Sequence, residues 1–177
     1  IKLQKSTLQQ QSSISITGSK SESNRLLLLQ ALYPNITIKN ISNSDDATLM
    51  QKALKSTNSV KNIHHAGTAM RFLTAYYATQ NGEEITLTGS SRMQERPIKI
   101  LVDALRQLGA EIQYTNNEGY PPLQIKGQKL QGNQVTLNAN ISSQYISALL
   151  LIAPTLENGL TLTLNGKITS VPYINMT

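Results

Sequence analysis

Apolar and polar residues follow two different spacings along this chain, and the two spacings predict helices and strands in turn. One-by-one alternation of apolar and polar residues predicts strands at 13–17, 85–88, 111–114, 123–126, 134–138 and 160–164. Apolar runs and apolar residues spaced three and four apart predict helices at 26–32, 45–54, 68–79, 97–108 and 144–152. Because helices and strands mix throughout, the pattern favours an α/β (mixed α+β) fold with helices packed on sheets.

The segment 97–108 carries the clearest helix signal. Its apolar residues fall on one face, namely Ile98, Leu101, Val102, Leu105 and Leu108. Pro97 suits the first helical turn, and Gly109 suits the C-terminal cap. We therefore expect an amphipathic helix whose apolar face is buried.

Three of the predicted strands run into a glycine turn that leads to a helix start. The glycines are Gly18, Gly89 and Gly166, and each is followed within a few residues by Ser, Lys or Arg. This recurrence predicts a little more than two copies of an α/β unit of roughly 70 residues. The alternative is that common turn sequences coincide by chance.

The composition indicates a soluble, cytoplasmic protein. With 177 residues the chain can bury the core of one domain, or of one and a fraction. It has no cysteine, which excludes disulfides, thiolate metal sites and a cysteine nucleophile. We expect neither a membrane span nor an export signal, because no apolar run approaches roughly 18–20 residues and no basic-then-apolar leader is seen.

The net charge of +6 suggests an acidic partner. The 16 Lys and Arg residues are scattered. The aromatic residues, seven Tyr and one Phe, do not alternate with basic ones as they do in proteins that stack nucleic-acid bases. A small acidic metabolite explains the charge better than nucleic acid, which stays the weaker alternative.

The stretch Gly18-Ser-Lys-Ser-Glu-Ser-Asn-Arg25 combines a predicted helix start with anion-binding side chains. Unpaired backbone N–H groups and the helix dipole favour an anion at such a start. Lys20 and Arg25 add positive charges, and Ser21 and Ser23 add hydroxyl donors. These groups predict a phosphate or carboxylate site.

Four further helix starts carry groups of the same kind. Gly67 would let a ligand approach the backbone, and Arg71, four residues on, lies on the same helical face. Arg92 and Arg96 offer guanidinium forks that match carboxylate and phosphate oxygens. The other two starts are Ser142-Ser-Gln144 and Ser170-Val-Pro-Tyr173. Five such starts in one chain predict an anion-binding site.

Each of these groups also has an ordinary structural explanation. Ser142 could be only a helix N-cap, which is the commonest role of a serine before a helix. Arg96 could pair with Glu95 or Asp103 on the surface, and Lys20 could be an ordinary solvated charge.

Two acidic residues and two histidines raise other possibilities. Asp45 and Asp46 could be general acid–base groups, but partners of the helix dipole in a first turn are the stronger interpretation. His64 and His65 suggest a metal, which the lack of nearby cysteines and spaced carboxylates disfavours.

The motifs resemble those of the 5-enolpyruvylshikimate-3-phosphate (EPSP) synthases. The matching segments, in the family's order, are Gly18–Arg25, Ala66–Arg71, Arg92–Pro97 with Leu101–Arg106, Ser142–Gln144 and Ser170–Thr177. Together they run across nearly the whole chain, which resembles the N-terminal part of such an enzyme. The resemblance implies transfer of the enolpyruvyl group from phosphoenolpyruvate to shikimate 3-phosphate. This step of the shikimate pathway leads to chorismate and the aromatic amino acids, and it is the target of glyphosate.

The resemblance also implies a fold and a domain organisation. EPSP synthases have two domains of βαβαββ repeats, each an inverse α/β barrel, with the substrates in the cleft between them. By this resemblance residues 1–17 would be a strand and crossover of the second domain, which is absent here. Residues 18–177 would be a truncated N-terminal domain. Its partners would be the two substrates and the missing C-terminal domain, with no metal and no organic cofactor.

Site residues follow from the resemblance position by position. Shikimate 3-phosphate would be held by Lys20, Ser21, Arg25, Ser142, Ser143, Gln144, Ser170 and Tyr173. Phosphoenolpyruvate would be held by Lys20, Gly67, Arg96 and Gln144, with Thr68, Arg71 and Arg92 in support. The proton-transferring Asp, Glu and Lys of the family would lie in the missing half, so no residue here is expected to be the catalytic base.

Two departures from the family bear on its response to glyphosate. His65 stands where many members have Asn, and Phe72 where many have Pro. A related family, which acts on UDP-N-acetylglucosamine, opens with Gly-Ala-Lys-Asn and carries a loop cysteine. The Ser after Lys20 and the absence of cysteine argue against it. A further alternative is that these residues alone are a binding module without turnover, because half the cleft would be missing.

Overall fold

The computed structural model describes residues 2–7, 10–138 and 140–177. Its helices are α1 (Lys20–Leu32), α2 (Asp45–Lys55), α3 (Gly67–Ala78), α4 (Ser91–Gln94), α5 (Lys99–Gln107), α6 (Ser143–Ile152) and α7 (Val171–Met176), with a 3-10 turn at Ala153–Thr155. Its strands are β1 (Val60–Asn62), β2 (Glu84–Thr88), β3 (Glu111–Tyr114), β4 (Leu123–Lys126), β5 (Gln134–Asn138) and β6 (Thr161–Asn165).

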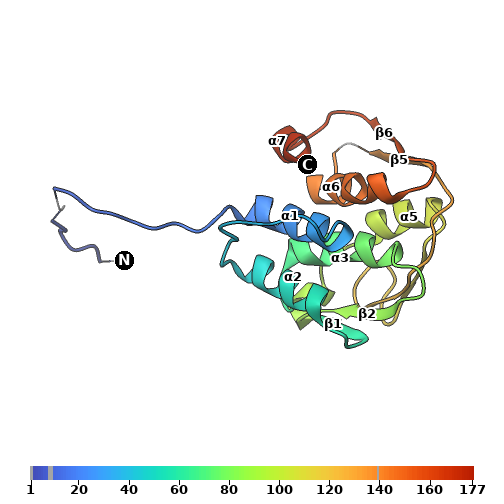
Figure 1. The fold of residues 1–177 in the computed structure, drawn as a ribbon, viewed down its shortest axis with the longest axis horizontal. Helices are drawn as coiled ribbons and strands as arrows, with labels where there is room; N and C mark the ends of the chain where they lie inside the picture. Colours follow the sequence, from blue (N-terminus) through green and yellow to red (C-terminus); the bar gives the residue numbers. More distant parts are fainter. Residues whose placement is uncertain (1, 8–9, 139) are drawn as a thin grey trace.

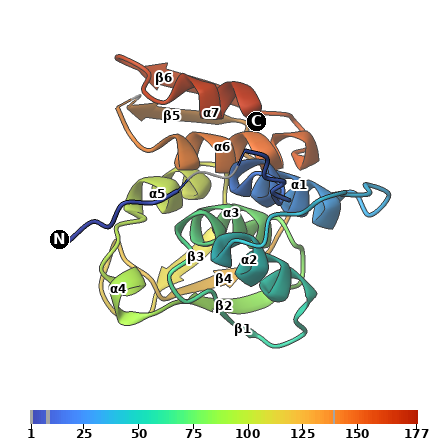
Figure 2. The same ribbon diagram turned by 90° about the vertical axis from the view of Figure 1, so that its left-hand side faces the viewer.

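The strands form two sheets with helices between them. One sheet has the order β1-β2-β4-β3, in which β1 and β2 are parallel and β4 is antiparallel to both of its neighbours. The other sheet is the parallel pair β5-β6. Figure 2 shows the two sheets on opposite outer sides of the molecule and the longer helices in the layer between them. The apolar residues of β2, β4 and β5 are buried on one face of each strand, as the alternating sequence predicts.

Three helices lie side by side in this layer, namely α1, α3 and α6 (Figure 1). α3 and α6 are apolar on nearly all sides and lie in the core, where Phe72, Leu73 and Leu149 are fully buried. Hydrogen bonds join the early turns of the three helices: Thr68 to Gln144, and Arg25 to Ser147. The three helices therefore begin at the same end of the molecule.

The element order repeats along the chain. Residues 60–126 run β1-α3-β2-α5-β3-β4, with the short α4 before α5, and β5-α6-β6-α7 then repeats the first part of that order. Gly89 follows β2 and Gly166 follows β6, so these two glycines occupy matching places. Gly18 does not, because the segment before it is not a strand.

Most predicted elements are confirmed, and the strand at 13–17 is wrong. Residues 10–17 form no helix or strand, and Ile14 and Ile16 are each 81% exposed. Alternation predicts only that a segment could pair, and no neighbouring strand among the described residues supplies hydrogen bonds to this one. The proposed crossover at 1–17 includes residues 1, 8 and 9, which lie outside the described residues. α4 and β1 were not predicted. The helix predicted at 26–32 begins six residues earlier, at Lys20, because Ser19 is its N-cap, so most of the polar run before residue 26 lies inside α1. α5 begins two residues later than predicted, because Ile98 is its N-cap.

One glycine holds the end of β4 against the end of α3. The Gly127 N–H donates to the Glu83 carbonyl at 2.7 Å. A Cβ on Gly127 would collide with the backbone carbonyl oxygens of Gln80 and Tyr77. We expect Gly127→Ala to lower the free energy of unfolding by about 1–2 kcal/mol, because backbone rather than a flexible side chain must move. Urea denaturation measures this, and a variant as stable as the wild type would contradict it.

Candidate functional site

The candidate site is built at the shared N-terminal end of α1, α3 and α6. Gln144 Nε2 in the first turn of α6 donates to Thr68 Oγ1 in the first turn of α3, at 3.2 Å. Arg25 Nη2 in α1 donates to Ser147 Oγ in α6, at 2.9 Å. Side chains that the sequence places up to 122 residues apart are therefore joined in one network.

Arg25 is the centre of the first part of this network. It is 6% exposed, and it donates four hydrogen bonds to described residues: to the Ser21 carbonyl, Ser147 Oγ, the Tyr173 carbonyl and Thr177 Oγ1. Burial lowers the pKa of its guanidinium, and the nearby Tyr173 opposes this. A guanidinium has five N–H donors, so one Nη1–H remains for a ligand. Arg25 thus holds α7 against α1 and α6.

Phe72, one of the two departures from the family, lies beneath Arg25. Its side chain is fully buried, and Arg25 Cζ lies 5.5 Å from the ring centroid. This cation–π contact is an internal one. Phe72 therefore affects the site through Arg25.

Arg71 is the centre of the second part. It is 5% exposed, and its Nη1 and Nη2 donate to the carbonyls of Gly67 and Pro97, each at 3.1 Å. Tyr145 Oη donates to the same Pro97 carbonyl at 2.7 Å, and its ring centroid lies 6.0 Å from Arg71 Cζ. Burial lowers the pKa of the Arg71 guanidinium, which Tyr145 opposes and Arg96 reinforces. Arg71 therefore fixes the loop that carries Arg96 to the start of α3.

Arg96 itself lies against the start of α3. A Cβ on Gly67 would come within 2.5 Å of Arg96 Nη1, so the guanidinium occupies the space that the missing side chain leaves. The sequence predicts that a ligand approaches Gly67, and in this structure the Arg96 side chain lies there. A pocket of about 530 Å³ opens here, lined by His65, Arg92, Met93 and Arg96. Among the described residues, no hydrogen bond or ion pair engages the Arg92 and Arg96 guanidinium groups.

The Asp46 carboxylate binds the N-terminal end of α3, where the sequence predicts that an anionic ligand binds. Its Oδ1 accepts from the backbone N–H groups of Thr68 at 2.9 Å and Ala69 at 3.4 Å. Asp46 is thus a dipole partner of α3 and not only of its own helix α2. The preference of the pocket for an anion therefore rests mainly on its two arginines.

The remaining predicted residues lie at the same helix starts. Lys20 is exposed in the first turn of α1, and Ser143 is half-buried in the first turn of α6. Ser142 is the N-cap of α6, and its hydroxyl accepts from the Gln144 N–H at 3.3 Å. The structural role that the sequence analysis gave as the alternative, a helix N-cap, is therefore confirmed. Ser170 precedes α7 in a left-handed conformation, with φ of 55°, and is exposed.

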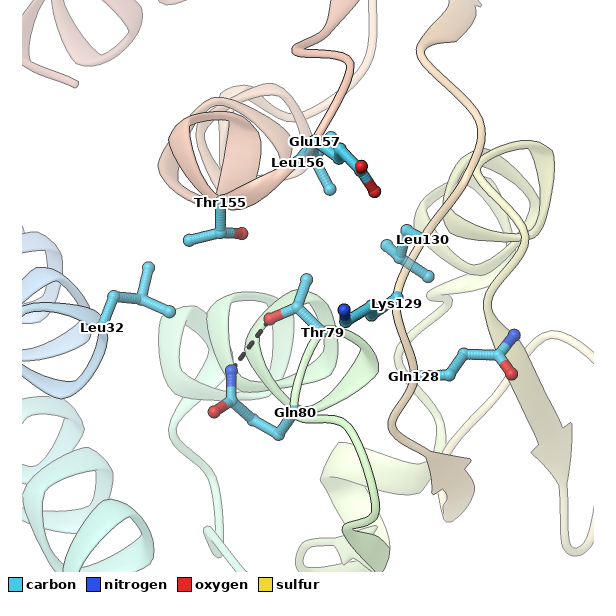
Figure 3. A pocket seen from close by; sticks show the side chains of 9 residues that line it. All are labelled: Leu32, Thr79, Gln80, Gln128, Lys129, Leu130, Thr155, Leu156 and Glu157. Carbon is cyan, nitrogen blue, oxygen red and sulfur yellow. Dashed lines mark hydrogen bonds between the residues drawn. The ribbon is translucent and has the colours of Figure 1, made fainter.

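A second pocket lies at the opposite ends of the same helices (Figure 3). It has about 360 Å³ and is lined by Leu32, Thr79, Gln80, Gln128, Lys129, Leu130, Thr155, Leu156 and Glu157. Helix C-termini carry partial negative charge, and the lining holds one cationic residue, Lys129, and one anionic residue, Glu157. Of these two pockets, the one at the N-terminal end is the better anion site.

Tyr145 was not predicted as a residue of the site, and His65 was named only as a metal candidate and as a departure from the family. Tyr145 directly follows Gln144, but its hydrogen bond to Pro97 joins residues 48 positions apart. His65 is next to the Gly67 turn, and this adjacency could have marked it as a pocket residue. The described residues hold no group of three or more His, Cys, Asp or Glu that could bind a metal. None of the helices among them combines the length and hydrophobicity needed to cross a membrane.

Comparisons with known proteins agree with this geometry. The family model described as EPSP synthase (3-phosphoshikimate 1-carboxyvinyltransferase) matches residues 54–177. A 3-phosphoshikimate 1-carboxyvinyltransferase of Bacteroides fragilis is 55% identical over 165 residues, which are 93% of this chain and 40% of that protein. The corresponding protein of Colwellia psychrerythraea is 45% identical over 191 aligned residues, covering 93% of this chain and 45% of its own length.

A solved structure supports the fold. The EPSP synthase of Acinetobacter baumannii superposes with a TM-score of 0.74 at 23% identity, over 92% of this chain and 42% of that one. This chain thus spans less than half the length of the relatives it matches. The match of the family model over most of the chain, together with these relatives, shows that the chain belongs to the EPSP synthase family.

Proposed function

We propose that the full-length protein transfers the enolpyruvyl group of phosphoenolpyruvate to shikimate 3-phosphate, and that this chain forms the N-terminal side of the substrate cleft. The observation that carries the proposal is the convergence of α1, α3 and α6 at one end, with Lys20, Gln144 and Arg96 on their first turns and the adjoining loop. Relatives with this sequence pattern are named for that reaction.

Phosphoenolpyruvate binds at the Arg96 pocket in this proposal. The Arg96 guanidinium offers two parallel N–H donors to phosphate oxygens, and Arg92 adds charge at the same pocket. Gln144 lies between the two substrates, because its amide already reaches Thr68 at the start of α3. Lys20 contacts both substrates.

Shikimate 3-phosphate binds along the α1, α6 and α7 starts. Ser142, Ser143 and Ser170 provide hydroxyl donors for its phosphate. Ser21, Tyr173 and the free Nη1–H of Arg25 complete this part of the site. The hydrogen bonds from Arg25 to Ser147 and to the Tyr173 carbonyl support it, since they bring these helix starts together.

The catalytic contribution of this half is to hold two mutually repelling anions in alignment. The positive groups offset the repulsion between the two phosphorylated substrates. Holding two reactants in reactive geometry can lower a barrier by about 7–11 kcal/mol. The residues that transfer protons come from the remainder of the protein, so the 177-residue chain binds anions weakly and does not turn over.

The domain organisation belongs to the same proposal. The helices between two outer sheets support an inverse α/β barrel of βαβαββ units, of which residues 18–177 form an incomplete part (Figure 2). Residues 1–17 cross to the second domain, and the exposed Ile14 and Ile16 become buried there. The protein is cytoplasmic and needs neither a metal nor an organic cofactor.

The test is a reconstitution assay. We expect full-length protein to form EPSP and phosphate from the two substrates, this chain alone to form none, and the missing half added separately to restore turnover. An inactive full-length protein would refute the proposed reaction. Turnover by this chain alone would refute the requirement for both halves.

Gly67→Ala should weaken phosphoenolpyruvate binding selectively. The new Cβ would lie 2.5 Å from Arg96 Nη1, so the guanidinium must move while the backbone stays in place. We expect the Kd of the full-length protein for phosphoenolpyruvate to rise about tenfold. Calorimetric titration measures it, and binding of shikimate 3-phosphate, which should be unchanged, is the internal control. Unaltered phosphoenolpyruvate affinity would contradict the placement of Arg96.

A further inference from the structure

Arg25 is a buried cation whose partners are neutral. Among the residues that the structure describes, no carboxylate forms an ion pair with it. Its hydrogen-bond acceptors are two backbone carbonyls and two hydroxyls. Removing a guanidinium from water is costly unless other groups replace the lost solvation. The neutral groups packed around Arg25 must therefore supply that compensation.

The ring of Phe72 supplies part of this compensation. Phe72 is fully buried in α3, and Arg25 Cζ lies over its ring, 5.5 Å from the centroid. The face of an aromatic ring carries partial negative charge and attracts a cation more strongly where water is excluded. The ring takes up none of the guanidinium N–H groups, so all of them stay available for hydrogen bonds.

Two of the Arg25 hydrogen bonds hold α7. Arg25 Nη2 donates to the Tyr173 carbonyl at 2.9 Å, and Nε donates to Thr177 Oγ1, just after the helix, at 2.7 Å. Thr177 Oγ1 also lies 2.9 Å from Ser147 Oγ in α6. No residue of α7, which the structure describes completely, is buried. In this chain the polar contacts, rather than apolar burial, therefore hold α7 in place.

We propose that Phe72 is a positioning residue, whose ring supports the Arg25 guanidinium so that it keeps α7 docked at the site. Ser170 precedes α7 and Tyr173 lies within it. The proposed function assigns both residues to shikimate 3-phosphate, and the identity of the ligand rests on that proposal. Phe72 itself touches no substrate. Its effect is that α7 is already ordered when the ligand arrives, so that binding does not bear the cost of ordering it.

The test is hydrogen exchange in the full-length protein with Phe72→Leu, which keeps an apolar side chain but removes the ring. We expect the backbone amides of residues 171–177 to exchange about 3- to 10-fold faster, because the buried Arg25 loses part of its stabilisation. Calorimetric titration should show the Kd for shikimate 3-phosphate rising by about the same factor and the Kd for phosphoenolpyruvate by less than about twofold.

Leu73→Ala is the matched control for this variant. Leu73 is the next residue of α3 and is also fully buried, but its side chain has no ring to attract a cation. Its replacement should lower the overall stability and leave both the exchange of α7 and the affinity for shikimate 3-phosphate near the wild-type values. Equal effects of the two variants on α7 would overturn the inference.

Fluorinated phenylalanines at position 72 separate the charge of the ring from its packing. Fluorine withdraws electron density from the ring face, while the side chain keeps nearly its size. We expect the exchange of α7 to speed up stepwise as fluorine atoms are added, and unchanged exchange across the series would overturn the inference. A wild type that binds no shikimate 3-phosphate would instead refute the proposed function. The exchange measurements need no ligand, so they would still decide whether Phe72 keeps α7 docked.

Discussion

Arg96→Ala in the full-length protein is expected to weaken phosphoenolpyruvate binding about 100- to 1000-fold. Arg96 lies in the pocket with no hydrogen bond or ion pair to any described residue, so its guanidinium is available to a ligand. Two charge-assisted hydrogen bonds to one phosphate, worth about 1.5–3 kcal/mol each, account for the size of the effect. Because the side chain is exposed, its removal should leave the fold unchanged.

Arg106→Ala is the matched control for this experiment. Arg106 is also an arginine near the end of a helix, but it lies 3.8 Å from Asp103 and donates to the Ile112 carbonyl on the outer surface. Its replacement should change the Kd less than about twofold. Equal losses in the two variants, measured by calorimetric titration, would refute the assignment of Arg96 to the phosphate.

Arg71→Lys is expected to lower the free energy of unfolding by about 2–3 kcal/mol, although it preserves the charge. Arg71 reaches the Gly67 and Pro97 carbonyls with two different nitrogens of one planar group. A single ammonium cannot span both carbonyls, yet it must remain buried with its charge. Phosphoenolpyruvate binding should weaken as well, since the loop before Pro97 carries Arg96.

Arg71→Met separates the hydrogen bonds from the cost of the buried charge. Methionine fills most of the space and removes the charge together with its desolvation cost, and the Pro97 carbonyl keeps its hydrogen bond from Tyr145. Methionine should therefore destabilise the protein less than lysine does. Urea denaturation of both variants measures the order. The reverse order would mean that the guanidinium charge itself stabilises the fold.

Local sequence signals located five of the helices among the described residues and most strands, but they placed the start of α1 six residues too late and missed α4. α3, α5 and α6 carry long periodic apolar patterns, and their ends fall within two residues of the prediction. The strand at 13–17 shows the limit of such signals, because a strand exists only where a neighbour completes its hydrogen bonds. β1 has three residues and α4 has four, which is too short for either periodicity to appear.

Many residues of the candidate site were predicted from the sequence, whereas Tyr145 and the hydrogen bonds that connect the residues were not. The turn motifs identified Gly67, Arg96 and Gln144 as residues at helix starts. The burial of Arg71 and Arg25 depends on which helices lie beside them, and that is decided by packing over the whole chain. A polar residue inside an otherwise apolar helix, such as Arg71 in α3, is the only local sign of such a role.

α1, α3 and α6 run in a common direction, so their N-terminal ends lie at one side of the molecule and their C-terminal ends at the other (Figure 1). The helix dipoles make the first side positive and the second negative. Aligned peptide dipoles add, so a positive field extends beyond the pocket into the surrounding solution, and a weaker negative field extends from the far end. We expect such a field to steer anions toward Arg96 before any contact is made. Added salt screens such a field over about 10 Å at 0.1 M ionic strength, and the rate of encounter falls accordingly.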